Sequence, residues 1–310
     1  MEAKNGGRLS PDAAVSQAPE NKRSRHLPAN LFLGSLGRTI SARLKRGRFL
    51  CRAVGIALLI VLGMSGCASQ GSARFTPAET MMWATYPLAS ERSIGTCFLV
   101  AMKDQRAVGG LVPVIVTSAH VVRSAGKGPI YLPLRMLDRE GNFSLAVFKI
   151  ATTEKNKRAY VTHPRYDVAA MELQVPSDAA TPFYLLLLEE KNLVKAGEPR
   201  VGEDVSFLGF PEGLPATSDL FPVLRGGRIA SYDPGLSATE GFLVNGDVYR
   251  GDSGGPVFRA AGNGDPKLLG MVINQVSLHG RQPFPVALAV KTNVIRETLQ
   301  LLAKRRAGPD

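Results

Sequence analysis

The sequence is poor in cysteine, and this excludes a small domain that depends on many disulfide bonds. Only three cysteines occur in 310 residues, whereas disulfide scaffolds place several pairs in fewer than about 100 residues. Apolar runs of about 18 residues or more are also missing, which argues against several membrane-spanning helices. No Cys/His spacing typical of a metal site and no glycine-rich phosphate loop occurs, so neither a metal nor a cofactor is predicted.

Acidic residues are in the minority, but the excess of positive charge is unevenly placed. The formal net charge is +12, from 38 Lys and Arg against 26 Asp and Glu. Residues 1–66 hold 11 of these basic residues and 3 of the acidic ones, and so carry +8. Because most of the excess precedes the main body, it indicates targeting and not nucleic-acid binding.

Residues 1–66 are predicted to be a disordered basic leader followed by an export signal. Residues 1–48 are rich in Gly, Ser, Pro and Asn and show no sustained apolar period. Basic residues then precede an apolar stretch at 53–63, which is the order of a signal peptide. As a helix this stretch reaches about 17 Å, short of the roughly 30 Å of a hydrocarbon core. A membrane-spanning anchor is therefore not expected.

The end of this signal, Met64-Ser65-Gly66-Cys67, resembles the bacterial lipobox, with Met64 where Leu is preferred. In a lipobox the cysteine is lipidated and becomes the mature N-terminus, so Cys67 would hold the protein on a membrane surface. Ala68 stands where Asp is associated with inner-membrane retention, and this favours the outer membrane. The alternative is an ordinary signal peptide and a soluble periplasmic or secreted protein. Residues 67–91 are predicted to be a tether.

From residue 92 onward the pattern is typical of an all-β protein in two halves, 92–190 and 191–310. Short apolar or alternating runs are separated by clusters of Gly, Pro and Asp, without an internal repeat. Such spacing favours a sandwich or barrels. One helix is predicted at about 292–306, capped by Thr292 or Asn293, with Val294, Thr298, Leu301 and Leu302 on one face. The predicted strands are 95–100, 112–116, 130–136, 144–150, 168–173, 205–209, 224–232, 254–258, 268–276 and 285–290.

The strongest local signal for chemistry is Gly-Asp-Ser-Gly-Gly-Pro at 251–256. Glycines around one serine form a tight turn whose backbone can approach a ligand closely. The N–H groups of Gly251 and Ser253 could stabilise the charge that develops on a carbonyl oxygen attacked by Ser253. The alternative is a glycine-rich hairpin turn without a catalytic role.

A serine nucleophile needs a general base, and His120 is the best candidate among the four histidines. His26 lies in the leader, His163 precedes a proline and His279 lies in a loop, whereas His120 ends a strand-like run. Asp167 begins an apolar strand, where a charge needs a partner, and it could orient the imidazole. The alternatives are a half-buried structural histidine and a turn-forming aspartate.

Together, Thr-Ser-Ala-His at 117–120, Tyr-Asp-Val-Ala at 166–169 and the motif at 251–256 resemble the chymotrypsin-fold, trypsin-like serine proteases of bacteria. The order His, Asp, Ser is that of the family, and the likeness covers roughly 92–305. It implies two antiparallel β-barrels with a cleft between them. It further implies that Ser253 attacks a peptide bond, His120 acts as general base and acid, and Asp167 orients His120. The Gly251 and Ser253 amides would form the oxyanion hole, and the partner would be a protein or peptide.

The same resemblance assigns a substrate pocket to Asp247, Arg250 and Ile273. Asp247 falls at the floor of the family's pocket, which would favour Arg or Lys; the alternative is a solvated turn residue. Arg250 lies at the predicted rim, where it favours acidic neighbours, and Ile273 lies in the strand that follows the serine. Pro285 and Val286 stand on the opposite wall where glycine is expected, and their bulk would narrow the pocket.

Two features of the animal enzymes are missing. No processed Ile-Val-Gly-Gly start precedes Ser93, so Asp252 is expected to have a partner other than a chain terminus. The disulfide that the family places beside the catalytic histidine is also missing, because Cys97 has no second cysteine in the mature body. We therefore expect Cys97 to be a buried apolar residue.

Two other classes of protein compete with the protease. A non-catalytic binding lipoprotein on a degenerate protease fold would retain the motifs without the activity. An α/β-hydrolase esterase would share Gly-x-Ser-x-Gly but requires the order Ser, Asp, His and a strand-turn-helix context.

Overall fold

The computed structural model describes residues 75–308, except 108–109, 138–142, 155–156, 175–184, 195–198, 216, 233–239, 260–264 and 279–281. The predicted leader, export signal and Cys67 lie outside the described residues. No helix within the described ranges is long and apolar enough to cross a membrane.

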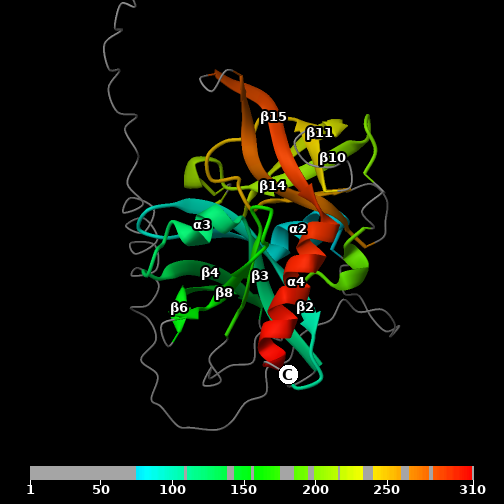
Figure 1. Ribbon diagram of the computed structural model, residues 1–310. Helices are drawn as coiled ribbons and strands as arrows, with labels where there is room; N and C mark the ends of the chain where they lie inside the picture. Colours follow the sequence, from blue (N-terminus) through cyan, green and yellow to red (C-terminus); the bar gives the residue numbers. More distant parts are fainter. Residues whose placement is uncertain are drawn as a thin grey trace, which may run out of the picture.

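The first half is an antiparallel sheet of seven strands in the order β5-β4-β1-β2-β3-β9-β8 (Figure 1). A separate two-stranded ribbon pairs β6 with β7, and the short helix α3 follows β3. The elements of this half are α2 (Pro77–Ala84), β1 (Thr85–Ala89), β2 (Ile94–Lys103), β3 (Leu111–Thr117), α3 (Ala119–Arg123), β4 (Ile130–Leu137), β5 (Phe143–Ile150), β6 (Thr153–Glu154), β7 (Lys157–Arg158), β8 (Tyr160–Thr162) and β9 (Ala169–Glu172).

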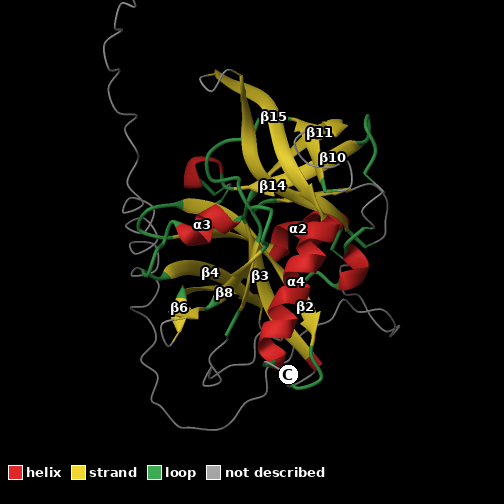
Figure 2. Cartoon of the chain, viewed as in Figure 1, coloured by secondary structure: helices red, strands yellow, loops and turns green. Residues whose placement is uncertain are grey.

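The second half is a closed antiparallel barrel in the order β10-β11-β12-β15-β14-β13, and the pairing of β10 with β13 closes it. The all-β prediction is confirmed, as Figure 2 shows. Of the two predicted barrels, the second is closed. The first is an open sheet with β5 and β8 as its edge strands. The elements are η2 (Glu190–Asn192), β10 (Asp204–Gly209), η3 (Pro211–Gly213), β11 (Val223–Tyr232), β12 (Gly241–Asn245), β13 (Pro256–Arg259), β14 (Lys267–Leu278), β15 (Gln282–Lys291) and α4 (Thr292–Ala307).

Strand β2 is buried on both faces, which explains its continuous apolar sequence. Successive side chains of a strand point to opposite faces. Cys97 and Leu99 belong to the core of the first half, whereas Phe98 and Val100 join a second core that also contains Phe258 of the barrel. The two halves therefore share a hydrophobic core, and their relative position is fixed by packing.

The folded body begins within the stretch predicted to be a tether. Helix α2 starts with a capping box: Thr76 Oγ1 accepts from the Glu79 N–H at 3.2 Å, and Glu79 Oε2 accepts from the Thr76 N–H at 2.7 Å. Strand β1 then pairs with β2 from Thr85 opposite Phe98 to Ala89 opposite Ile94. Residues 77–89 are thus part of the first half.

Helix α4 confirms the predicted C-terminal helix, but two details of that prediction are wrong. The cap residue is Lys291 and not Thr292 or Asn293; the Thr292 hydroxyl instead donates to Val194 O at 2.5 Å. Leu301 is 36% exposed and does not share the buried face. Figure 1 shows α4 running from the barrel along the first sheet.

The predicted strands are all present with shifted ends, and the largest shifts, of three residues, are at the end of β2 (Lys103) and the start of β15 (Gln282). The strands β1, β6, β7, β8 and β12 were not predicted.

Candidate active site

His120 and Asp167 lie together at one end of the first sheet. His120 is the second residue of α3, which follows β3, and Asp167 lies in the turn between β8 and β9. His120 Nδ1 is 2.5 Å from Asp167 Oδ2, and the His120 backbone N–H donates to Asp167 Oδ1 at 2.9 Å. Because the carboxylate only accepts, the imidazole proton is assigned to Nδ1. This leaves His120 Nε2 as a proton acceptor, and the His120 side chain is half exposed.

Ser253 lies in the tight turn before β13, and the glycine after it is required by space. Gly254 has φ of +93°, in the region that favours glycine. A Cβ on Gly254 would lie 1.9 Å from Thr96 O, a backbone atom of β2. The turn can therefore pack against β2 only with glycine at this position.

The turn with Ser253 and helix α3 meet across Gly95. A Cβ on Gly95 would lie 2.6 Å from Val121 Cγ2 and 3.1 Å from Ser253 O. Ser253 Oγ donates to Ile273 O at 3.3 Å, and no hydrogen bond joins Ser253 to His120 in the part of the chain that is described. A rotation about χ1 of Ser253 is the movement that would redirect its hydroxyl.

Two backbone N–H groups beside Ser253 have no acceptor among the described residues. They belong to Gly251 and Ser253, whereas the N–H of Asp252 donates to Tyr249 O and that of Gly254 to Val272 O. Arg250 O accepts from the Glu212 N–H at 2.6 Å. Since a trans peptide places its C=O and N–H on opposite sides, the Gly251 N–H points away from Glu212. Both predicted oxyanion donors thus lie in one loop, without an acceptor in the described part of the chain.

Thr96 of β2 holds this loop and was not predicted as a functional residue. Its Oγ1 donates to Gly251 O at 2.7 Å and accepts from the Phe210 N–H at 3.3 Å. Its backbone N–H donates to Ser253 O at 2.8 Å. Thr96 is fully buried. The only sign of this role in the sequence is a threonine within an apolar run, between Gly95 and Cys97.

Asp252 is fully buried and has the non-terminal partner that its position required. Arg225 of β11 donates to both carboxylate oxygens, at 2.5 and 2.8 Å, and the Tyr249 N–H donates at 2.7 Å. The guanidinium also lies 4.9 Å from the ring centroid of Phe207. Arg225 was missed because a charge in an alternating strand is typical of an outward-facing residue.

The candidate pocket residues differ in their surroundings. Asp247 and Arg250 are exposed, and the Asp247 carbonyl accepts from Arg225 Nη1 at 3.1 Å. Ile273 is buried and contributes the carbonyl that accepts from Ser253. Pro285 is exposed, Val286 is buried, and Pro285 O accepts from the Gly246 N–H at 3.0 Å.

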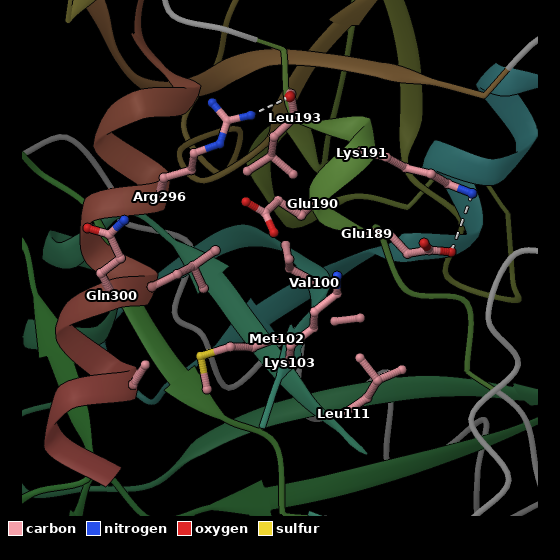
Figure 3. Close-up of a pocket in the computed structure, with 13 residues that line it drawn as sticks. Val100, Met102, Lys103, Leu111, Glu189, Glu190, Lys191, Leu193, Arg296 and Gln300 are labelled. Carbon is pink, nitrogen blue, oxygen red and sulfur yellow. Dashed lines mark hydrogen bonds and ion pairs between the residues drawn. The ribbon is translucent and has the colours of Figure 1, made fainter. Parts of the chain in front are cut away.

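A cavity of about 710 Å³ lies elsewhere, between β2, η2 and α4 (Figure 3). Its lining includes Met102, Glu190 and Arg296 but none of the candidate site residues. Arg296 is occupied by the carbonyls of Leu193 and Val194.

Cys97 is fully buried, as predicted, and burial raises the pKa of its thiol. Among the residues the structure describes, no group of three or more His, Cys, Asp or Glu side chains could hold a metal ion.

Comparison with known proteins places the chain in a family. Residues 95–271 match the family model described as a trypsin-like peptidase domain, while a search of curated proteins gives no match. Many solved structures are also similar, and three of them are described here. Rv3671c protease in an inactive form is 21% identical over 71% of this chain and 89% of that chain, with a TM-score of 0.43. A second Rv3671c structure, from M. tuberculosis H37Rv, is 20% identical over 74% and 90%, with a TM-score of 0.44. The thermostable serine protease AL20 from an extremophilic microorganism is 13% identical over 73% of this chain and 99% of that chain, with a TM-score of 0.45.

Since the family model covers more than half of the sequence, this chain belongs to the trypsin-like peptidase family and is a trypsin-like serine protease.

Proposed function

We propose that the protein is an endopeptidase that cleaves peptide bonds through Ser253, His120 and Asp167. The observation that carries this proposal is the grip of Asp167 on both the ring and the backbone of His120. With Nδ1 held by Asp167, Nε2 is the nitrogen left to act as the base, and the backbone of the Ser253 turn lies close to α3 across Gly95. Binding of a peptide would complete the geometry, because such hydrogen bonds are often loose in unliganded enzymes.

The proposed reaction proceeds in two stages. Ser253 Oγ attacks the carbonyl carbon while His120 Nε2 takes the hydroxyl proton, and the oxygen that becomes negative accepts from the Gly251 and Ser253 N–H groups. His120 then gives this proton to the amine that leaves, and an acyl-enzyme remains. Water attacks the ester by the same route and restores Ser253. Loss of one oxyanion donor typically raises such a barrier by about 2.7–4 kcal/mol.

Labelling with a fluorophosphonate probe, read by intact mass, tests this proposal. We expect one adduct on the parent protein and none on Ser253→Ala. Absence of an adduct on folded parent protein would contradict the proposal and favour the non-catalytic binding protein.

The proposal includes export and lipid anchoring through Cys67, on the support of the sequence alone. The lipobox resemblance at 64–67 and the basic, apolar and small-residue order before it carry this part. Metabolic labelling with a fatty acid in a bacterial host should mark the parent protein and not Cys67→Ser. Equal labelling of the two would contradict the anchor and favour a soluble periplasmic or secreted form.

We further propose a preference for Arg or Lys substrates, on the position of Asp247. Its side chain is exposed, and no contact among the described residues involves its carboxylate. Profiling with a peptide library should show a basic preference that weakens in Asp247→Asn. An unchanged profile would leave Asp247 as a solvated turn residue.

A further inference from the structure

His163 is a buried histidine that the proposed reaction does not use. It lies in the β8–β9 turn that also carries Asp167, and its side chain is 2% exposed. Its Nδ1 accepts from two backbone N–H groups of the turn, those of Arg165 at 3.2 Å and Tyr166 at 3.1 Å. The imidazole thus serves as a cap for the backbone immediately before Asp167.

The protonation pattern of this ring follows from its partners. Because Nδ1 accepts, the neutral ring carries its proton on Nε2. His163 Nε2 lies 3.0 Å from Glu297 Oε2 of α4, so the Nε2–H group donates a hydrogen bond to this carboxylate. Tyr166 stacks on the ring with centroids 4.9 Å apart. Glu297 therefore favours the only neutral tautomer that can cap the turn.

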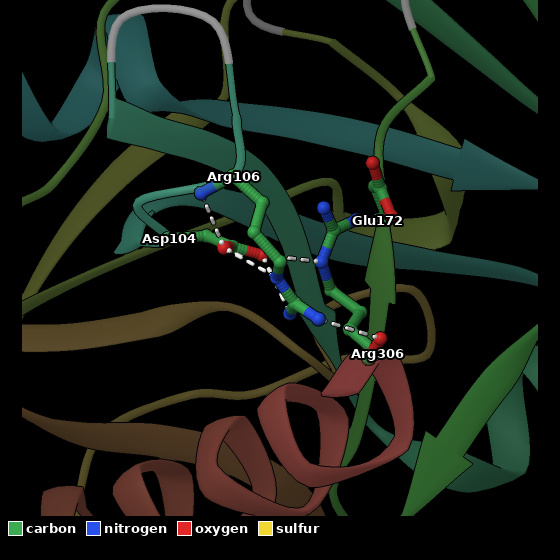
Figure 4. Close-up of polar contacts among 4 residues, drawn as sticks. All are labelled: Asp104, Arg106, Glu172 and Arg306. Carbon is green, nitrogen blue, oxygen red and sulfur yellow. Dashed lines mark hydrogen bonds and ion pairs between the residues drawn. The ribbon is translucent and has the colours of Figure 1, made fainter. Parts of the chain in front are cut away.

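Helix α4 also holds the two strands beside the turn. Arg305 Nη1 donates to Tyr160 O of β8 at 3.0 Å. Arg306 pairs with Glu172 at the end of β9 and, through Nε, with Asp104 Oδ2 at 3.0 Å, as Figure 4 shows. The strand before Asp167, the turn and the strand after it are all tied to one helix.

We propose that His163 is a positioning residue for Asp167, and that Glu297 fixes the His163 tautomer for this task. The inference rests on the proposed function, because its purpose is the Asp167–His120 contact. With its acceptor lost, the two part-buried N–H groups would have no partner in their present positions, and the turn would rearrange to bring them to water. A displacement of about 1 Å at a catalytic group can cost about 100-fold in rate.

Two substitutions at one position separate capping from packing. His163→Asn keeps an acceptor, Oδ1, at the position of Nδ1, whereas His163→Leu has similar bulk and none. We expect His163→Leu to label with the fluorophosphonate probe about 10- to 100-fold more slowly than the parent, and His163→Asn to recover most of this loss. Thermal unfolding of each variant checks that the protein is folded.

A double-mutant cycle shows whether His163 acts through Asp167. In an Asp167→Ala background, His163→Leu should have no further effect on the labelling rate. An equal loss in both backgrounds would contradict the inference, as would a parent that labels no faster than a folded His163→Leu.

Nuclear magnetic resonance with ¹⁵N-histidine gives a readout independent of activity. We expect His163 to carry its proton on Nε2, and the His120 Nδ1–H signal to move in His163→Leu but not in His163→Asn. A proton on His163 Nδ1, or an unmoved His120 signal, would overturn the inference even if the parent labels. A parent that does not label at Ser253 contradicts the proposed function, and the His120 signal then still decides the positioning role.

Glu297 provides the matched control on α4. Glu297→Gln keeps an oxygen that accepts from His163 Nε2–H, whereas Glu297→Leu does not. We expect only the second to slow labelling, and by less than His163→Leu does, because His163 Nδ1 is still present. Equal rates for the two variants would show that Glu297 does not fix the tautomer.

Discussion

At the scale of single residues, a few buried polar side chains hold the backbone of the candidate site in place. Thr96 is one of these, since its hydroxyl joins Gly251 O to the Phe210 N–H. Asp252 is another, since Arg225 and a backbone N–H occupy its carboxylate. Such groups are costly to leave unpaired in a buried setting, so their substitution should affect stability and activity together.

Thr96→Val should weaken both properties. The substitution keeps the shape but leaves Gly251 O and the Phe210 N–H without a partner, so we expect a loss of about 1–3 kcal/mol in the free energy of unfolding. Urea unfolding measures this loss, and probe labelling should slow in parallel because the Gly251 peptide is no longer held. Thr96→Ser, which keeps the hydroxyl, should stay close to the parent; equal behaviour of the two variants would refute the role of the hydroxyl.

Arg225→Met should be strongly destabilising. It leaves Asp252 charged and buried without its partner, which typically costs about 3–5 kcal/mol in the free energy of unfolding. Arg228→Met on the same strand is the matched control, because the Arg228–Asp204 pair is largely exposed and exposed ion pairs contribute little to stability. Similar midpoints in urea for both variants would contradict the assigned importance of Asp252.

At the scale of elements, sequence patterns identified those parts of the chain with strong periodicity. The continuous apolar runs of β2 and β3 predicted both strands, because the residues of each strand fill two cores. Strand β8 is only Tyr160–Thr162, too short for a period to be visible. Helix α2 and β1 were assigned to a tether, although Thr76-Pro77-Ala78-Glu79 has the form of a capping box.

Thr76→Ala tests whether the folded body really begins at α2. Loss of the cap should reduce the free energy of unfolding by about 1 kcal/mol, and Thr76→Ser should have little effect. Thermal unfolding of the two variants gives the comparison. If Thr76→Ala left stability unchanged, α2 would behave as the tether that the sequence pattern indicated.

At the scale of the whole molecule, the resemblance carried by the His-Asp-Ser order and the three motifs predicted the fold class and the contact between His120 and Asp167. Asp167 and His120 could be paired from sequence because the resemblance supplied a topology. Arg225 and His163 could not, because each becomes important only through a partner distant in sequence. No local pattern shows that Glu297 of the last helix lies beside a turn in the first half.

Stability of the whole molecule should fall in alkaline solution through Tyr86. This side chain is fully buried, and burial raises its pKa to about 12 from an ordinary value of 10.0. The unfolded chain therefore loses the Tyr86 proton at lower pH than the folded protein. The Tyr86 contribution is complete below about pH 10 and is lost as the pH rises toward 12, at up to about 1.4 kcal/mol per pH unit. Urea unfolding between pH 9 and about 11.5 measures this, and Tyr86→Phe should show a flatter dependence. Identical slopes would contradict the assignment.

The attachment of α4 to the Asp167 turn also bears on the time at which this protease becomes complete during synthesis. Ribosomes add about 5–20 residues per second, so Glu297 is made on the order of 10 s after His163. Until then the first sheet has its aspartate but neither the helix that holds it nor, for most of that interval, the serine. We therefore expect the candidate site to be complete only after α4 has been made.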